Sequence, residues 1–156
     1  MLSTTYTWTR RDVDDITNPR RGNLIQLEDA KGNVTRFEYD RNDRLVKETL
    51  PLGQAMSYQY DAAGNLTQRT DPLGTRTLYT HDNANRVTLT ERRNAANAVQ
   101  RSTTMTWDEA NNLTAWSDTD PTRPAGQQTS SATLTYDDAN RKTGETITYP
   151  NGTTLG

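Results

Sequence analysis

The chain lacks cysteine and is poor in apolar residues. Without cysteine it can form neither disulfides nor thiolate sites, and the cellular compartment stays open. Hydrophobic residues make up 31% of the 156 residues, whereas ordinary globular domains carry about 45–50%. Taken alone, this composition is close to that of disordered chains. However, the 7 Tyr, 3 Trp and 1 Phe recur at regular intervals, which is typical of a folded repeat.

Long apolar runs are also absent from the sequence. None approaches the roughly 18 residues of a membrane span. The start of the chain, Met1 to Thr5, is polar and is not followed by the apolar region of a signal peptide. We therefore expect no membrane span, and we expect any export signal to lie elsewhere.

Charge of one sign is not in excess, because 18 Lys and Arg residues stand against 20 Asp and Glu residues, a formal net charge of −2. A nucleic-acid partner is not expected, since binding phosphates requires a basic excess. His81 is the only histidine, and a lone histidine builds no typical zinc site without several carboxylates. No glycine-rich phosphate loop occurs. The sequence predicts no catalytic residue, no metal site and no cofactor.

An aromatic residue or histidine followed by aspartate recurs along the chain. The pairs are Tyr39-Asp40, Tyr60-Asp61, His81-Asp82, Trp107-Asp108 and Tyr136-Asp137. Successive pairs are 21, 21, 26 and 29 residues apart, and this periodicity predicts a repeat architecture. Three residues after each aspartate, a Gly, Asn or Asp begins a second element, as in Gly64-Asn65-Leu66. Because the dense Gly/Asp pattern of calcium repeats is missing, the aspartates are interpreted as Asx-turn residues that hydrogen-bond the backbone.

A second turn lies halfway through each of the first three units. Its glycines, 21 residues apart, are Gly32, Gly53 and Gly74. The stretch Asp71-Pro72-Leu73-Gly74 has turn chemistry, because proline presets φ and glycine accepts positive φ. The runs 65–70 and 75–81 on either side of it predict the two strands of a hairpin.

The second strand of each unit alternates between two kinds of residue. Thr77, Tyr79 and His81 share one face, whereas Arg76 and Thr80 lie on the other. The matching sets are Thr35, Phe37 and Tyr39; Met56, Tyr58 and Tyr60; Thr103, Met105 and Trp107; and Ala132, Leu134 and Tyr136. This period of two is typical of half-buried strands. The sequence predicts an all-β fold of stacked antiparallel hairpins in a curved, spiralling sheet of solenoid type. Trp107 and Trp116 are interpreted as core residues rather than as sugar-stacking platforms.

The last two complete units are longer than the others by five and eight residues. Because repeat proteins place insertions in loops, we expect the extra length near residues 94–97 and 121–126. Any partner contact is expected at the loops 92–101 and 118–131. We expect a segment of a longer array, because neither end shows a polar capping unit. The expected organisation is the end of a preceding repeat and a loop at 1–21, repeats at 22–42, 43–63, 64–84, 85–110 and 111–139 (together 22–139), and a truncated repeat at 140–156.

The repeated unit resembles the YD-repeat, or Rhs-repeat, family. The motif is almost complete between Tyr60 and Asp82, in Tyr60, Asp61, Gly64, Asn65, Leu66, Asp71, Pro72, Gly74, Thr77, Tyr79 and Asp82. The resemblance implies hairpins that wind into a hollow shell. In bacterial Rhs proteins and insecticidal Tc toxins the shell encloses a toxic C-terminal domain, and animal teneurins use a similar shell at the cell surface. The family's self-cleaving module and toxin follow the repeats and are not recognised in this sequence.

The resemblance implies a structural and not an enzymatic role. The chain would be a shell segment that encapsulates a toxic effector and helps deliver it, by type VI secretion or as a polymorphic toxin in bacterial competition. The implied partners are other segments of the same shell, the enclosed toxin domain, and a secretion-apparatus spike or chaperone. The implied location is cytoplasmic before export and extracellular after delivery. The alternative is an extracellular module that binds carbohydrate or a receptor through its two long loops.

Overall fold

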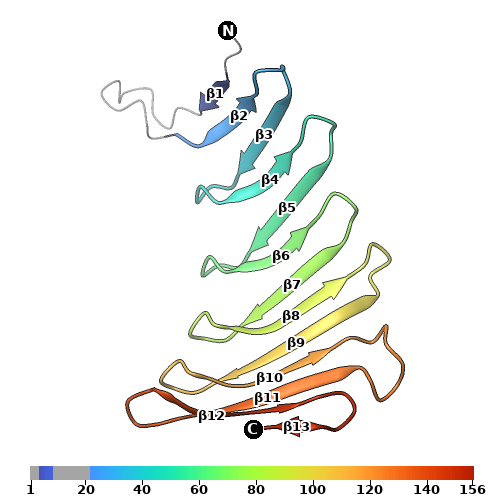
Figure 1. The fold of residues 1–156 in the computed structure, drawn as a ribbon. Coiled ribbons are helices and arrows are strands. Elements are labelled where there is room, and N and C mark those ends of the chain that lie inside the picture. Colours follow the sequence, from blue (N-terminus) through green and yellow to red (C-terminus); the bar gives the residue numbers. More distant parts are fainter. Residues whose placement is uncertain (1–3, 9–21) are drawn as a thin grey trace. The chain divides into compact units, whose positions relative to one another are not determined.

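The computed structural model describes residues 4–8 and 22–156. Among these residues the helices and strands are all β-strands (Figure 1). The predicted all-β fold of antiparallel hairpins is confirmed. Of the segment 1–21, expected to end a preceding repeat, residues 1–3 and 9–21 lie outside the described residues. The strands are β1 (Thr5–Trp8), β2 (Leu24–Glu28), β3 (Val34–Tyr39), β4 (Leu45–Thr49), β5 (Ala55–Tyr60), β6 (Leu66–Thr70), β7 (Arg76–His81), β8 (Val87–Arg93), β9 (Val99–Trp107), β10 (Leu113–Thr119), β11 (Thr129–Tyr136), β12 (Lys142–Thr148) and β13 (Thr154–Leu155).

The pairing of the strands follows the chain. Within the described residues, each strand is hydrogen-bonded to its neighbours in the linear order β1 to β13. The described residues form two compact units, 4–8 and 22–59 with 69–72, and 60–68 with 73–156. Nearest-neighbour pairing is the organisation of repeat proteins, in which each unit contacts only the units beside it. The described residues include no helix that is long and apolar enough to cross a membrane.

The residues before the repeated aspartates are called ladder residues below; they are Tyr39, Tyr60, His81, Trp107 and Tyr136. The pairing register shifts at several of these residues, for example between Thr80 and His81 and between Thr135 and Tyr136. Past each turn the backbone has a positive φ of 59° to 96°, at Asp43, Gly64, Asn85, Asn111 and Asn140. Glycine and Asx residues accept this conformation at the lowest cost, and such a residue commonly closes a hairpin turn with a bulge. This explains why Gly, Asn or Asp stands three residues after each aspartate.

The two faces of the sheet differ in the unit of residues 60–68 and 73–156. On one face of β9 to β12, the residues directly opposite one another are Met105, Trp116, Ala132 and Ile147. On the other face, the corresponding row is Thr106, Ala115, Thr133 and Thr146. One face of these strands is therefore apolar and the opposite face is rich in small hydroxyl side chains, as the period of two predicts.

The sheet has almost no buried core. Among the described residues only Ala132 is buried, with 3% of its surface exposed, and it lies between Trp116 and Ile147 in the apolar row. Trp107 and Trp116, expected to be core residues, are half-buried instead. The reason is that a core requires two packed layers, whereas the described strands belong to one sheet.

The five extra residues of the fourth unit do not form the expected loop. β8 has seven residues and β9 has nine, whereas β6 has five and β7 has six. The turn between β8 and β9 stays tight, because Asn94 N–H donates to Ala98 O at 3.0 Å and Asn97 N–H donates to Asn94 O at 2.9 Å. The inserted residues therefore lengthen the paired strands. In the fifth unit a longer loop is present, closed by Asp120 N–H donating to Gln128 O at 2.8 Å.

Candidate functional site

One aspartate organises the turn that follows each ladder residue. At Asp108, carboxylate Oδ1 accepts the N–H of Asn112 at 2.8 Å, and Oδ2 accepts Asn112 Nδ2 at 2.9 Å. The backbone closes the same turn, because Asp108 N–H donates to Asn112 O at 3.0 Å. The other four aspartates lie in equivalent turns. They are Asp40, Asp61, Asp82 and Asp137. Each carboxylate thus serves as the turn's own acceptor and needs no metal ion to be satisfied.

The residue four positions after the aspartate alternates between two types. Along the chain these residues are Arg44, Asn65, Arg86, Asn112 and Arg141. The arginines bind the aspartate of their own turn: Arg86 Nε lies 2.8 Å, and its Nη2 lies 2.7 Å, from Asp82 Oδ2. Such charge-assisted pairs are stronger than hydrogen bonds between neutral groups.

Side chains of both types also link one turn to the next, since Arg86 Nη1 donates to Asn111 Oδ1 at 3.0 Å. Asn65 Nδ2 donates to Asn85 Oδ1 at 2.7 Å, and Asn112 Nδ2 donates to Asn140 Oδ1 at 3.0 Å. The acceptors are residues with positive φ that close the following turn. The side chain that fixes the local turn therefore also ties successive hairpins together.

Two ladder aromatics join the two strands of their own repeat. Trp107 Nε1–H donates to Val87 O at 2.8 Å, and the Tyr136 hydroxyl donates to Leu113 O at 3.0 Å. Each acceptor is the carbonyl of the first residue of the preceding strand, β8 or β10. The Arg86 guanidinium lies 5.8 Å from the centre of the Trp107 ring, within the range of a cation–π contact. Each of these two side chains thus packs its ring against the sheet and hydrogen-bonds a backbone carbonyl through its polar atom.

The remaining motif residues lie where the repeat places them. Tyr39, Tyr60 and His81 end β3, β5 and β7, while Thr77 and Tyr79 lie within β7 and Leu66 begins β6. The turn between β6 and β7 holds Asp71, Pro72 and Gly74. Burial raises the pKa of the Tyr39 hydroxyl above its usual value. Within the described residues, no group of three or more His, Cys, Asp or Glu side chains could hold a metal ion.

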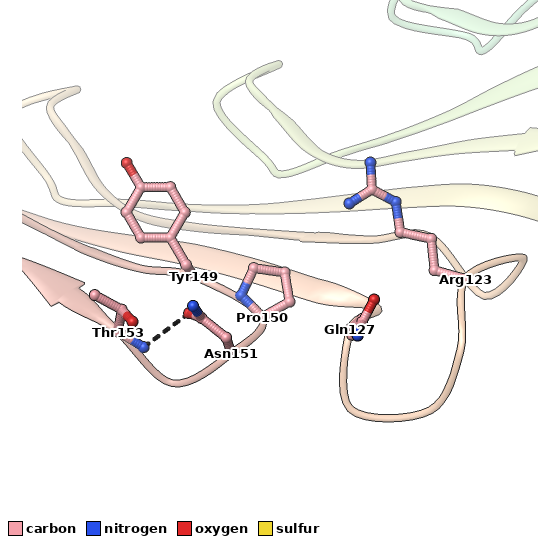
Figure 2. Close-up of a pocket in the computed structure, with 6 residues that line it drawn as sticks. All are labelled: Arg123, Gln127, Tyr149, Pro150, Asn151 and Thr153. Carbon is pink, nitrogen blue, oxygen red and sulfur yellow. Dashed lines mark hydrogen bonds between the residues drawn. The ribbon is translucent and has the colours of Figure 1, made fainter.

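A pocket lies beside the long loop between β10 and β11. It has a volume of about 380 Å³ and an open mouth. Figure 2 shows its two walls, which are the loop residues Arg123 and Gln127 and the facing turn of Tyr149, Pro150, Asn151 and Thr153. The first wall falls in the loop 118–131, where the sequence predicted partner contact. The second wall was not foreseen, although the turn chemistry of Tyr149-Pro150-Asn151-Gly152 marks it in the sequence.

The first aspartate turns lie in the part of the chain that matches a known repeat family. The family model described as RHS Repeat matches residues 20–55 and 60–99, which contain the first aspartate turns of the series. These two segments are RHS repeats. The resemblance to Rhs repeats seen in the sequence is thereby confirmed, and a comparison with curated proteins gives no match.

The RHS repeats share their fold with solved toxin structures. A crystal structure of TcdB2-TccC3-Cdc42 has 22% identity and a TM-score of 0.67 over 80% of this chain. A structure of the Photorhabdus luminescens Tc holotoxin pore has 19% identity and a TM-score of 0.52 over 85%. A crystal structure of TcdB2-TccC3 has 18% identity and a TM-score of 0.53 over 84%. The chain spans only 6% to 9% of the length of these proteins, so the likeness is one of fold.

The RHS turns make the stability of the chain depend on pH. The Asn65 amide holds the pKa of Asp61 below its usual value, and the Asn112 amide does the same for the pKa of Asp108, with backbone N–H groups adding to both. A carboxyl whose pKa is lower in the folded state stabilises the fold above its unfolded pKa of about 3.9 and loses that contribution as the pH falls below it.

We therefore expect the urea midpoint of unfolding, followed by tryptophan fluorescence, to fall between pH 6 and pH 3. The variant Asp108→Asn keeps an acceptor oxygen but cannot titrate, so its midpoint should depend less on pH. Equal midpoints for the unaltered chain at both pH values would contradict this assignment.

Proposed function

We propose that this chain is a segment of a shell wall that encloses a toxic C-terminal domain and helps deliver it from a bacterium. The observation that carries the proposal is a single sheet of hairpins tied turn to turn, with Ala132 as the only buried residue among those described. A fold shared with Tc toxin structures supports it. The chain has no catalytic role in this proposal, and any enzymatic activity belongs to the enclosed domain.

The physical argument concerns what a single sheet can do. A hairpin is marginally stable alone, and an isolated layer buries little apolar surface. The turn-to-turn bonds of Asn65 and Asn112 act between neighbouring hairpins, and the ladder bonds of Trp107 and Tyr136 join the two strands of one hairpin. They favour a continuous wall over a compact domain. Such a wall separates a cargo from its surroundings without chemistry of its own.

Partners and location follow from the same proposal. The partners are further repeats of the same shell, the enclosed toxin domain, and a secretion-apparatus spike or chaperone. The repeats would form in the cytoplasm of the producing cell and act outside it, after type VI secretion or release as a polymorphic toxin. The domain boundaries proposed from the sequence, with repeats between residues 22 and 139, describe the wall as five successive units.

This proposal predicts how the isolated chain behaves. β1 and β13 each have one strand partner among the described residues, so each leaves one edge open. Open edges pair with other chains, and we expect light scattering after size exclusion to give a mass above the 17.6 kDa of one chain, rising with concentration. A folded, β-rich monomer at all concentrations would contradict the proposal and favour a free-standing module.

The pocket favours a second candidate, a binding role for the long loop between β10 and β11. The alternative expected from the sequence was a module that binds carbohydrate or a receptor through two long loops. Only the second of those loops is long, because residues 94–98 form a tight turn. A binding role therefore concerns residues 120–128 and the turn that faces them.

A further inference from the structure

We infer that the pocket between the β10–β11 loop and the β12–β13 turn is a binding site for a neutral saccharide. This inference does not depend on the shell function, because a wall segment and a free-standing module would both carry the pocket. Its volume of about 380 Å³ lies within the roughly 300–1,000 Å³ typical of small-molecule sites.

The aromatic wall of the pocket offers a stacking surface. Tyr149 has 41% of its surface exposed, although large apolar side chains are usually covered. Pro150 follows it, and Figure 2 shows the Tyr149 ring standing beside the pyrrolidine ring on the same turn. An aromatic ring with a polar tip binds ligands that have both an apolar face and hydroxyl groups. A pyranose ring has both.

Polar groups on both walls of the pocket offer hydrogen bonds that the protein does not use. Asn151 Oδ1 accepts the N–H of Thr153 at 3.0 Å, which orients the amide. Among the described residues, Asn151 Nδ2, the Gln127 side-chain amide and the Tyr149 hydroxyl make no hydrogen bond to the protein. Amides and hydroxyls both donate and accept. This combination matches sugar hydroxyl groups, which do the same.

The charge around the pocket argues for a neutral ligand. Arg123 Nε lies 3.3 Å from Asp120 Oδ2, so the one cation of the lining already has an acidic partner. The nearby Asp118 is paired with Arg101 at 2.8 Å. A phosphate or an acidic sugar would meet Asp120 beside Arg123, whereas a neutral sugar can accept from the guanidinium and donate to the carboxylate.

The test is binding of the labelled full chain to an array of neutral, sialylated and sulfated oligosaccharides, followed by titration of the best neutral one. We expect a neutral glycan to bind, and Tyr149→Ala to weaken it about tenfold by removing the stacking surface. Tyr149→Phe keeps the ring and loses only the hydroxyl, so it should weaken binding less than Tyr149→Ala. Gln127→Ala changes the opposite wall and should also weaken it, with circular dichroism showing that each variant keeps its strands.

The matched control is Tyr6→Ala in β1, because Tyr6 is also exposed, at 57%, but lies outside the pocket. Its affinity should equal that of the unaltered chain. Three results would overturn the inference: no neutral glycan bound, affinity unchanged in Tyr149→Ala, or equal losses in Tyr149→Ala and Tyr6→Ala. None of them bears on whether the repeats enclose a cargo.

Discussion

Replacing Trp107 with alanine is expected to lower the local stability of β8 and β9 by about 2–3 kcal/mol, less than the roughly 3–5 kcal/mol of a fully buried tryptophan. The ring is half-buried on the apolar face. The substitution removes its packing, its hydrogen bond to Val87 O and its contact with Arg86. Amide hydrogen exchange in β8 and β9 measures the loss, because it reports local opening free energies. Protection should fall by roughly 30- to 140-fold, since each 1.4 kcal/mol is tenfold.

Trp107→Phe separates the ring from its hydrogen bond. Phenylalanine keeps the aromatic packing and lacks the Nε1 donor, so the loss should be about 1 kcal/mol, the usual net value of one hydrogen bond. Exchange rates that do not change in Trp107→Ala would contradict the role given to the ladder residues. Equal losses in the two variants would mean that the ring contributes nothing beyond its hydrogen bond.

Gly74→Val is expected to cost more than the same change at Gly53. Both glycines have positive φ, +79° and +83°, a conformation that costs other residues roughly 1–2 kcal/mol and β-branched residues more. A Cβ at position 74 would also lie 3.3 Å from Ala95 Cβ, whereas nothing lies within 4 Å of one at position 53. Valine at position 74 therefore combines backbone strain with crowding against the tip of the next hairpin.

The control for Gly74→Val is Gly74→Asn. Asn97 occupies the corresponding place in the next hairpin with a φ of 69°, so asparagine suits the backbone there. Hydrogen exchange in β7 should show a clear loss of protection in Gly74→Val and a smaller one in Gly74→Asn. For Gly53, the amides of β4 and β5 give the comparison. Equal effects of valine at the two positions would show that contact with Ala95 has no energetic consequence.

The repeated local elements could be predicted from the sequence. Turn residues such as Gly74 and Asn85 have a conformational requirement that few other residues meet. The alternation in Thr77, Tyr79 and His81 indicates a strand with two different faces before any partner is known. The strand spans expected at 65–70 and 75–81 agree with β6 and β7 to within one residue.

Features that depend on neighbouring repeats could not be predicted in this way. The bond from Asn65 to Asn85 joins residues 20 positions apart, and its geometry depends on how two turns stack. The insertion around Asn94 resembled a loop, yet its flanking residues found partners and lengthened β8 and β9. Half-burial of Trp116 depends on the absence of a second layer over its face, which periodicity does not report. The pocket needs two turns that are adjacent only once β11 and β12 have paired.

The most direct test of the shell proposal is electron cryo-microscopy of the natural full-length polypeptide that carries these repeats. We predict that residues 22–156 form consecutive hairpins in a continuous wall and that density for the C-terminal domain lies inside the wall. Repeats that form an extended arm, with the C-terminal domain outside it and open to solvent, would contradict the proposal.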